Sequence, residues 1–199
     1  MRFRLPCLTC AFALLACGPV VATPVAFVPN EASGTVSVID TATDRVTSTI
    51  TTGGKPRGIA IAPDGKRLYV SDQTANGLAV FDVGTNGAPV RVSLGDSPEG
   101  IYLSPDGRKL AAAIEENNRV LIVDAASLSI EKRVAMRGKN PEHAVWSPDA
   151  RWIYVSAEEA DSVDIVDVAR GEVVKSITVG ERPRGIGFLP DGSLSLIHI

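Results

Sequence analysis

Apolar residues along this chain come in short runs and not at helical spacing. Typical runs are TVSVID (35–40), LYVS (68–71) and VVKSITVG (173–180), which are rich in β-branched and aromatic residues and are separated by Gly, Pro, Asp and Asn. No stretch after residue 22 places apolar residues at i, i+3, i+4 and i+7 over three turns. Short runs of this kind between turn residues predict β-strands and no helix.

The runs recur with a period of 42 or 43 residues. The turn sequence Pro-Asp-Gly starts at Pro63, Pro105 and Pro190, and a Pro-Asp-Ala version starts at Pro148. Four strands fit within one such period, which is the length of one propeller blade, although helical repeats overlap it in length. Since the strands exclude helical repeats, we predict an all-β fold, a β-propeller of four-stranded antiparallel blades with about four repeats present.

The turns of the repeat have local explanations. In the Pro-Asp-Gly turn, proline presets φ, aspartate bonds back to the backbone and glycine takes the left-handed position. Ala150 replaces that glycine in one copy, which should cost about 1 kcal/mol if the left-handed geometry is kept. A second set of aspartates ends the third strand of each copy, where we expect Asx turns and no catalytic role. These are Asp40, Asp82, Asp124 and Asp167.

Three segments carry a resemblance to a known family. LYVSDQ (68–73), IYVSAE (153–158) and AFVPNE (26–31) each precede a V-x-V-I-D-like strand and a P-x-G-I-A-x-S-P-D-G phrase, and together they resemble the YVTN-type β-propeller repeats. The resemblance covers residues 26–192. LAAAIE (110–115) and NPEHAVW (140–146) depart from the repeat pattern.

Two phrases look most like a narrower subgroup of that family. RPRGIGFLPDG and NPEHAVWSPD resemble periplasmic propellers associated with catabolism that depends on the quinone cofactor PQQ. The resemblance implies a binding protein accessory to quinoprotein alcohol oxidation, with a periplasmic quinoprotein dehydrogenase or a small ligand as partner. PQQ enters by resemblance only. The residues themselves predict no cofactor and no metal site, because tryptophan-docking repeats, a CxxCH haem motif and a calcium-loop series are missing.

Residues 1–22 have the pattern of a secretory signal peptide. Arg2 and Arg4 precede the apolar run LPCLTCAFALLA, and Val20-Val21-Ala22 provides a small-residue cleavage site. We therefore expect cleavage after Ala22 and a periplasmic or secreted protein. The alternative is a lipoprotein signal, Leu14-Leu15-Ala16-Cys17, with a lipid anchor on Cys17. No other run is long enough to span a membrane.

The cysteines and the charge balance limit the remaining classes. Cys7, Cys10 and Cys17 all lie in the leader, so the rest of the chain contains no free thiol and no disulfide. Without Arg2 and Arg4, 18 of the 20 basic residues remain against 23 acidic ones. This acidic balance without a basic patch argues against nucleic-acid binding.

We expect residues 23–192 to form a partial propeller. The repeats account for strands two to four of one blade, three whole blades, and the first strand of another. By family resemblance such propellers usually close with seven blades, which needs about 300 residues at this period. A four-bladed ring, in which the strand near Arg184 completes the N-terminal blade, is the alternative. In the tail SLSLIHI (193–199), Ser195 falls where the repeat requires leucine, so we expect this segment not to be native sequence.

A charged rim is predicted on one face of the propeller. The residue after the proline of each inner strand is Arg57, Glu99, Glu142 or Arg184, and these positions should surround the mouth of the central channel. The loop after the second strand adds acidic residues to the same face. They are Glu31, Asp72, Glu115, Glu116, Glu158, Glu159 and Asp161. The rim either docks a small ion or a partner, or consists of charges that pair across blades.

His143 departs from the repeat, since the other three copies have glycine at its position. Ala144 follows it where those copies have isoleucine, so one interpretation is repacking, in which the imidazole fills space between blades with Trp146 nearby. Alternatively it is a functional group beside Glu142 that titrates near neutral pH, ligates a metal or binds an anion. The ligand-binding candidates are Arg57, Glu99, Glu142, His143 and Arg184. We expect binding and not catalysis, because no nucleophile motif is present and no catalytic residue can be named.

The enzymatic alternative is a propeller lactonase or isomerase that acts on a small anionic substrate. It would use Glu142 and His143 for acid–base chemistry and Arg57 and Arg184 as an anion clamp.

Overall fold

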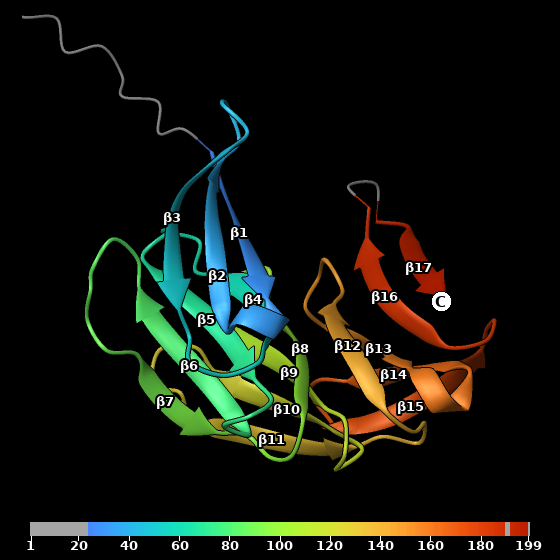
Figure 1. Ribbon diagram of the computed structural model, residues 1–199. Coiled ribbons are helices and arrows are strands. Elements are labelled where there is room, and N and C mark those ends of the chain that lie inside the picture. The colour runs from blue at the N-terminus through green and yellow to red at the C-terminus, as the bar shows by residue number, and fades with distance from the viewer. Residues whose placement is uncertain (1–23, 190–191, 199) are drawn as a thin grey trace, which may run out of the picture.

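The computed structural model describes residues 24–189 and 192–198, which form five antiparallel sheets arranged in an arc (Figure 1). Each sheet is one blade of a propeller, so the predicted all-β architecture is confirmed. The three complete blades contain the following strands: second blade, β4 (Pro56–Ile61), β5 (Arg67–Asp72), β6 (Gly77–Asp82) and β7 (Val90–Ser93); third blade, β8 (Pro98–Leu103), β9 (Lys109–Ile114), β10 (Arg119–Asp124) and β11 (Ile130–Ala135); fourth blade, β12 (Pro141–Trp146), β13 (Trp152–Ala157), β14 (Ser162–Asp167) and β15 (Glu172–Thr178).

The two ends of the arc are partial blades. The first blade consists of β1 (Val25–Asn30), β2 (Thr35–Asp40) and β3 (Arg45–Thr51), and the fifth of β16 (Pro183–Phe188) and β17 (Leu194–His198). Within the described residues β16 pairs with β17 and not with β1, and the two ends lie apart in Figure 1. The alternative of a four-bladed ring closed by the strand near Arg184 is therefore wrong for this structure.

The tail after Gly192 adopts the second strand of the fifth blade. Leu194 pairs with Phe188, the register in which Leu68 pairs with Ile61 in the second blade. Leu194 follows its partner Phe188 by six positions, whereas Leu68 follows Ile61 by seven, so Leu194, and not Ser195, takes the position of the repeat leucine. Whether residues 193–199 are native stays a prediction, and the predicted leader, residues 1–22, lies outside the described residues.

The inner strands β4, β8, β12 and β16 lie next to one another along the concave side of the arc. Glycine permits this close approach: a Cβ on Gly58 would lie 2.5 Å from the carbonyl oxygen of Glu99, and one on Gly100 would lie 2.8 Å from that of Glu142. Outside this wall, fully buried aliphatic side chains such as Leu68, Leu110 and Ile153 fill the space between the blades. The core is thus divided among the junctions between blades.

The turn predictions are largely confirmed. Ala150 has a φ of +58°, so it keeps the left-handed geometry that Gly65 adopts at +71°. Asp40 and Asp124 accept hydrogen bonds from the backbone two and three residues later, as Asx turns do. Among the residues that the structure describes, the expectation of no helix fails only at two single 3₁₀ turns, η1 (Glu31–Ser33) and η2 (Glu158–Ala160), which follow second strands.

Candidate functional site

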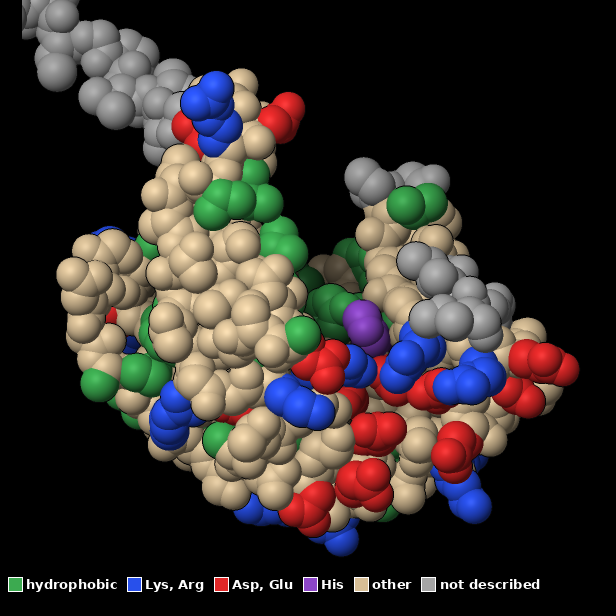
Figure 2. All heavy atoms as spheres, in the orientation of Figure 1, with side chains coloured by type: hydrophobic (Ala, Val, Ile, Leu, Met, Phe, Trp, Pro, Cys, Tyr) green, Lys and Arg blue, Asp and Glu red, His purple; other side chains and the backbone are tan. Residues whose placement is uncertain are grey.

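The candidate residues lie where the sequence placed them, at one end of the inner strands. Arg57, Glu99, Glu142 and Arg184 are each the second residue of their strand, so neighbouring blades bring them side by side. Figure 2 shows acidic and basic side chains in a band along this end, beside a hollow in the concave side of the arc. We refer to this band as the rim.

Arg57 connects the second blade to three other blades at the rim. Its Nη1 lies 2.9 Å from Glu31 Oε2 in the first blade, and its Nε and Nη2 lie 2.7 and 2.6 Å from Glu99 Oε2 in the third. Glu142 Oε2 of the fourth blade lies 3.9 Å from Nη2. Each guanidinium nitrogen thus faces a carboxylate.

Arg184 continues the chain of ion pairs on the other side. Its Nη2 lies 2.6 Å from Glu142 Oε1 and 3.3 Å from Glu158 Oε2. Arg182, which the sequence reasoning missed, also forms an ion pair with Glu158. Of the two interpretations of the rim, the one in which charges pair across blades therefore describes Arg57 and Arg184.

The carboxylates of these pairs are not exposed to solvent as in a surface ion pair. The side chains of Glu99 and Glu142 are each only 3% exposed, so their charges depend on the arginines. Burial raises the pKa of Glu99, although Arg57 opposes this. Burial also tends to lower the pKa of Arg57, but the carboxylates of Glu99 and Glu31 outweigh it and the pKa is raised.

Glu142 has the most perturbed carboxyl group at the rim. Burial, and then a carboxyl–carboxyl hydrogen bond with Glu158, raise its pKa to about 7 against the opposing effect of Arg184. The same hydrogen bond, together with Arg182, lowers the pKa of Glu158. As the pH falls, Glu142 is therefore the first of the two carboxyl groups to take up a proton.

Not every predicted rim residue belongs to the rim. Asp72 is buried, accepts hydrogen bonds from the backbone N–H groups of Lys55 and Ala75, and pairs with Arg91 at 3.2 Å, so it holds the loop between two blades. The remaining acidic positions lie at the edge of the face. Glu115 accepts a bond from Ser97 Oγ, Asp161 accepts the Arg182 backbone N–H, and Glu116 and Glu159 are exposed.

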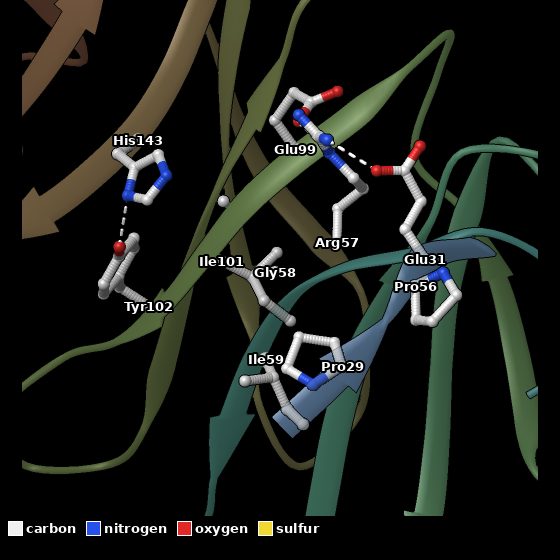
Figure 3. A pocket seen from close by; sticks show the side chains of 11 residues that line it. Pro29, Glu31, Pro56, Arg57, Gly58, Ile59, Glu99, Ile101, Tyr102 and His143 are labelled. Carbon is white, nitrogen blue, oxygen red and sulfur yellow. Dashed lines mark hydrogen bonds and ion pairs between the residues drawn. The ribbon is translucent and has the colours of Figure 1, made fainter. Parts of the chain in front are cut away.

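His143 lies beside the hollow and not only between the blades. Its Nδ1 is 2.5 Å from the hydroxyl oxygen of Tyr102 in the third blade (Figure 3). Burial, and then the positive charges of Arg57 and Arg184, lower the pKa of His143. The imidazole is therefore neutral near pH 7, which removes an imidazolium as an anion-binding group.

Tyr102 is the main residue that the sequence reasoning missed. It pairs with Ala111, whereas the second blade has the reverse arrangement, with Ala60 opposite Tyr69. A tyrosine at this inner register stands where the other copies have Ala60, Val145 and Gly187, and this departure beside His143 was the available signal. Burial raises the pKa of Tyr102 to about 12, so the phenol stays protonated.

The hollow has a volume of about 360 Å³. Arg57, Glu31 and Glu99 line one end, His143 and Tyr102 line another side, and apolar groups including Pro29, Ile59 and Ile101 form the wall between them (Figure 3). This size and mixture are typical of small-ligand sites. In residues 24–189 and 192–198 no three His, Cys, Asp or Glu side chains gather to hold a metal ion.

The sequence matches the model of the YNCE-like β-propeller family over residues 4–181, which is most of the chain. The chain belongs to this family. No curated protein matches it. Hydrazine synthase from Kuenenia stuttgartiensis is a similar solved structure, with 25% identity and a TM-score of 0.79 over 86% of this chain and 51% of that one.

A second solved structure, a putative 6-phosphogluconolactonase from Bacteroides uniformis ATCC 8492, has 17% identity and a TM-score of 0.72. The match covers 88% of this chain and 61% of that structure. The YNCE-like chain therefore spans about half to three fifths of the length of these two neighbours. The second likeness shows the fold alone. Within the described part of the chain, no helix has the length and apolar character needed to cross a membrane.

Proposed function

We propose that this YNCE-like propeller is a non-enzymatic periplasmic protein that binds a small molecule in the hollow beside the rim. The observation that carries the proposal is the combination of a hollow of about 360 Å³ with a neutral polar pair, Tyr102 and His143, on its wall. The rim arginines are engaged by carboxylates, so they position the inner strands and do not act as free catalytic groups.

The binding function can be tested with labelled protein and a panel of small metabolites. The panel should contain neutral, anionic and cationic compounds, each added at millimolar concentration while two-dimensional NMR spectra are recorded. We expect shifts concentrated on β4, β8 and β12 for at least one compound. If no compound affects the resonances of these inner strands, the hollow is not a small-molecule site and the proposal is wrong.

The resemblance to propellers of PQQ-dependent catabolism gives the proposal its context, an accessory role beside a periplasmic quinoprotein dehydrogenase. The chain's own residues do not fit PQQ, because this polycarboxylate needs free cations and the arginines lining the rim are already paired with Glu31, Glu99, Glu142 and Glu158. A role beside such an enzyme predicts that the purified chain changes the enzyme's rate with alcohol or its sedimentation. If a mixture of the two proteins shows neither change, the accessory role is wrong.

The periplasmic location depends on residues 1–22, which lie outside the described part of the chain. Expression in a Gram-negative host with fractionation should yield a soluble periplasmic protein whose N-terminal residue is Thr23. A lipid-modified N-terminal cysteine at Cys17 would support the lipoprotein alternative, and an uncleaved cytoplasmic chain would contradict both.

One observation supports a second candidate, a lactonase-like activity. Burial and Glu158 raise the pKa of Glu142 to about 7, the range in which a carboxyl group can serve as a general acid or base. Glucono-1,5-lactone is a suitable probe. Hydrolysis above the spontaneous rate that falls at least about tenfold in Glu142→Gln and His143→Ala would establish the activity; hydrolysis unchanged by both substitutions, or no hydrolysis, would exclude this assignment.

A further inference from the structure

The Tyr102–His143 pair presents one hydrogen-bond donor and one acceptor, whichever way its shared proton points. If the phenol donates to Nδ1, the imidazole Nε2 carries the ring N–H and the phenol oxygen keeps an acceptor lone pair. If Nδ1–H donates instead, the phenol O–H becomes free to donate and Nε2 accepts. Figure 3 shows Nε2 on the side of the ring that faces the other residues of the hollow.

A matching ligand group must both donate and accept hydrogen bonds. A carboxylate or phosphate only accepts, and an ammonium only donates. A hydroxyl group does both, so it can complete the pair in either tautomer. Leaving one member of such a pair without a partner lowers affinity, because a desolvated polar group then lacks its hydrogen bond.

The surrounding charges also disfavour ions. An anion would have to displace Glu31, Glu99 or Glu142 from Arg57, whose three nitrogens all face carboxylates. A cation beside the imidazole would meet the same positive field from Arg57 and Arg184 that disfavours protonation of His143. Both effects point to an uncharged ligand.

The walls next to the pair suit a carbon skeleton. On one side are Pro29, Ile59 and Ile101, and on the other a second hollow of about 330 Å³ is lined by Tyr102, His143, Ile186 and Phe188. The pair therefore lies between two spaces with apolar walls, each large enough for several carbon atoms.

We propose that the Tyr102–His143 pair binds the hydroxyl group of an uncharged small alcohol or polyol. This inference rests on the proposed function, since it names the class of ligand for the same hollow. It assigns the selectivity to two residues that replace a glycine and a small residue of the repeat, and it gives the arginines no direct contact with the ligand.

Three compounds with one carbon skeleton test the inference. Propane-1,2-diol is neutral, lactate is its anionic counterpart and 1-aminopropan-2-ol its cationic one. Binding is followed by the ¹⁵N shifts of the His143 imidazole and the backbone shifts of β8 and β12. We expect the diol to bind at least about tenfold more tightly than either ion, because a carboxylate or ammonium loses its hydration beside rim charges that are already paired.

Tyr102→Phe should weaken diol binding by about tenfold, because it removes the hydroxyl and keeps the ring. His143→Gly, which restores the residue of the other copies, should weaken diol binding by a similar factor, because it removes the other half of the donor–acceptor pair. Tyr154→Phe is the matched control: Tyr154 packs edge-to-face on Phe188 and is not among the residues that line either hollow, so binding should not change.

The possible outcomes test the inferred class of ligand separately from the proposed binding function. Tighter binding of lactate or 1-aminopropan-2-ol in the hollow, or diol binding that is unchanged in Tyr102→Phe, overturns the inference while the binding function stands. If none of the three compounds shifts the resonances of β8 and β12, the inference is wrong, and a silent metabolite panel would then remove the binding function as well.

Discussion

The junction between the second and third blades differs from the next one, between the third and fourth. At the first junction, Ser71 Oγ accepts the N–H of Gly58 at 2.7 Å and donates to the carbonyl of Glu99 at 2.6 Å. Tyr69 fills the space behind it and donates its hydroxyl hydrogen to the carbonyl of Ala125 at 3.0 Å. These blades are therefore joined by the hydrogen bonds of Ser71 to two backbone groups, which we call the serine tie, and by the side chain of Tyr69.

At the second junction the large side chains come from the inner strands. The third blade has Ala111 and Ala113 at the positions of Tyr69 and Ser71, so both the tyrosine and the serine tie are missing there. Trp146 packs in the same cluster as these two alanines and donates its indole N–H to the carbonyl of Tyr102 at 3.0 Å. The predicted repacking around His143 is thus confirmed for Trp146.

The difference shows how a repeat protein can gain a polar surface at one junction without a new fold. Because bulk moves from the second strand to the inner strand, two polar rings come to face the channel at this junction. At the first junction the corresponding residues are Ala60 and Gly100, which carry no polar side chain. The departures LAAAIE and NPEHAVW therefore compensate each other: small residues on the second strand of one blade accompany large residues on the inner strand of the next.

The largest expected effect comes from removing the indole that defines the second junction. Trp146→Ala should lower the free energy of unfolding by about 3–5 kcal/mol, because it leaves a cavity in a buried cluster. Urea denaturation followed by circular dichroism measures this. Trp152→Ala is the control, since that side chain is only partly buried and is covered by Arg151; an equal loss in both variants would contradict the role of Trp146.

The second junction also differs in its charges. Its two rim residues, Glu99 and Glu142, are both buried acids that pair with arginines. Arg57→Met should therefore lower the free energy of unfolding by about 2–4 kcal/mol, as it leaves Glu99 without its ion-pair partner. Arg108→Met, at a fully solvated pair with Asp106, should change it by less than about 0.5 kcal/mol. Chemical denaturation of both variants compares them, and equal effects would show that the rim contributes no more than a surface pair.

The serine tie can be removed from the first junction alone. Ser71→Ala should lower the free energy of unfolding by about 1–2 kcal/mol, because the buried carbonyl of Glu99 and the partly buried N–H of Gly58 lose a partner. Ser93→Ala, at an exposed position of β7, is the matched control and should have little effect. Thermal unfolding of the two variants measures this difference. An unchanged stability of Ser71→Ala would mean that the junction does not need these hydrogen bonds, just as the third blade folds with alanine at this position.

The smallest expected effect concerns the turn of the fourth blade. Ala150→Gly should raise the free energy of unfolding by about 1 kcal/mol, because alanine is strained at a φ of +58° where the second blade has glycine. Matched denaturation curves in urea would show the gain as a higher midpoint. A lower midpoint would mean that the freedom glycine adds to the unfolded chain outweighs the strain.

The sequence predicted the fold well because the signal is repeated. Strand positions, the turns at Pro63 and Pro148, and the face that carries Arg57 and Glu142 all follow from the 42-residue spacing and the alternation of hairpins. The new finding at the rim is the depth of burial of Glu99 and Glu142. This depends on how neighbouring blades pack, which spacing along the chain does not describe.

Contacts between blades were harder to predict. Tyr102 and Arg182 act on residues more than 20 positions away, through side chains whose direction depends on the junction. The unusual size of Tyr102 was visible in the aligned copies, but its partner was not. The aligned copies identify His143 as a departure from glycine, whereas its neutral state depends on burial and on two arginines from other blades.

The most direct test of this account is the protonation state of His143. ¹⁵N-imidazole spectra recorded as a function of pH, assigned with His143→Gly because the sequence has a second histidine, report the pKa and the tautomer. We predict a pKa below the ordinary value of 6.5, so the ring is neutral at neutral pH. Because the folded-state pKa lies below that of the unfolded chain, this group should also destabilise the fold as the pH falls below 6.5. A pKa above 6.5, with an imidazolium at neutral pH, would contradict the neutral donor–acceptor pair on which the proposed binding site depends.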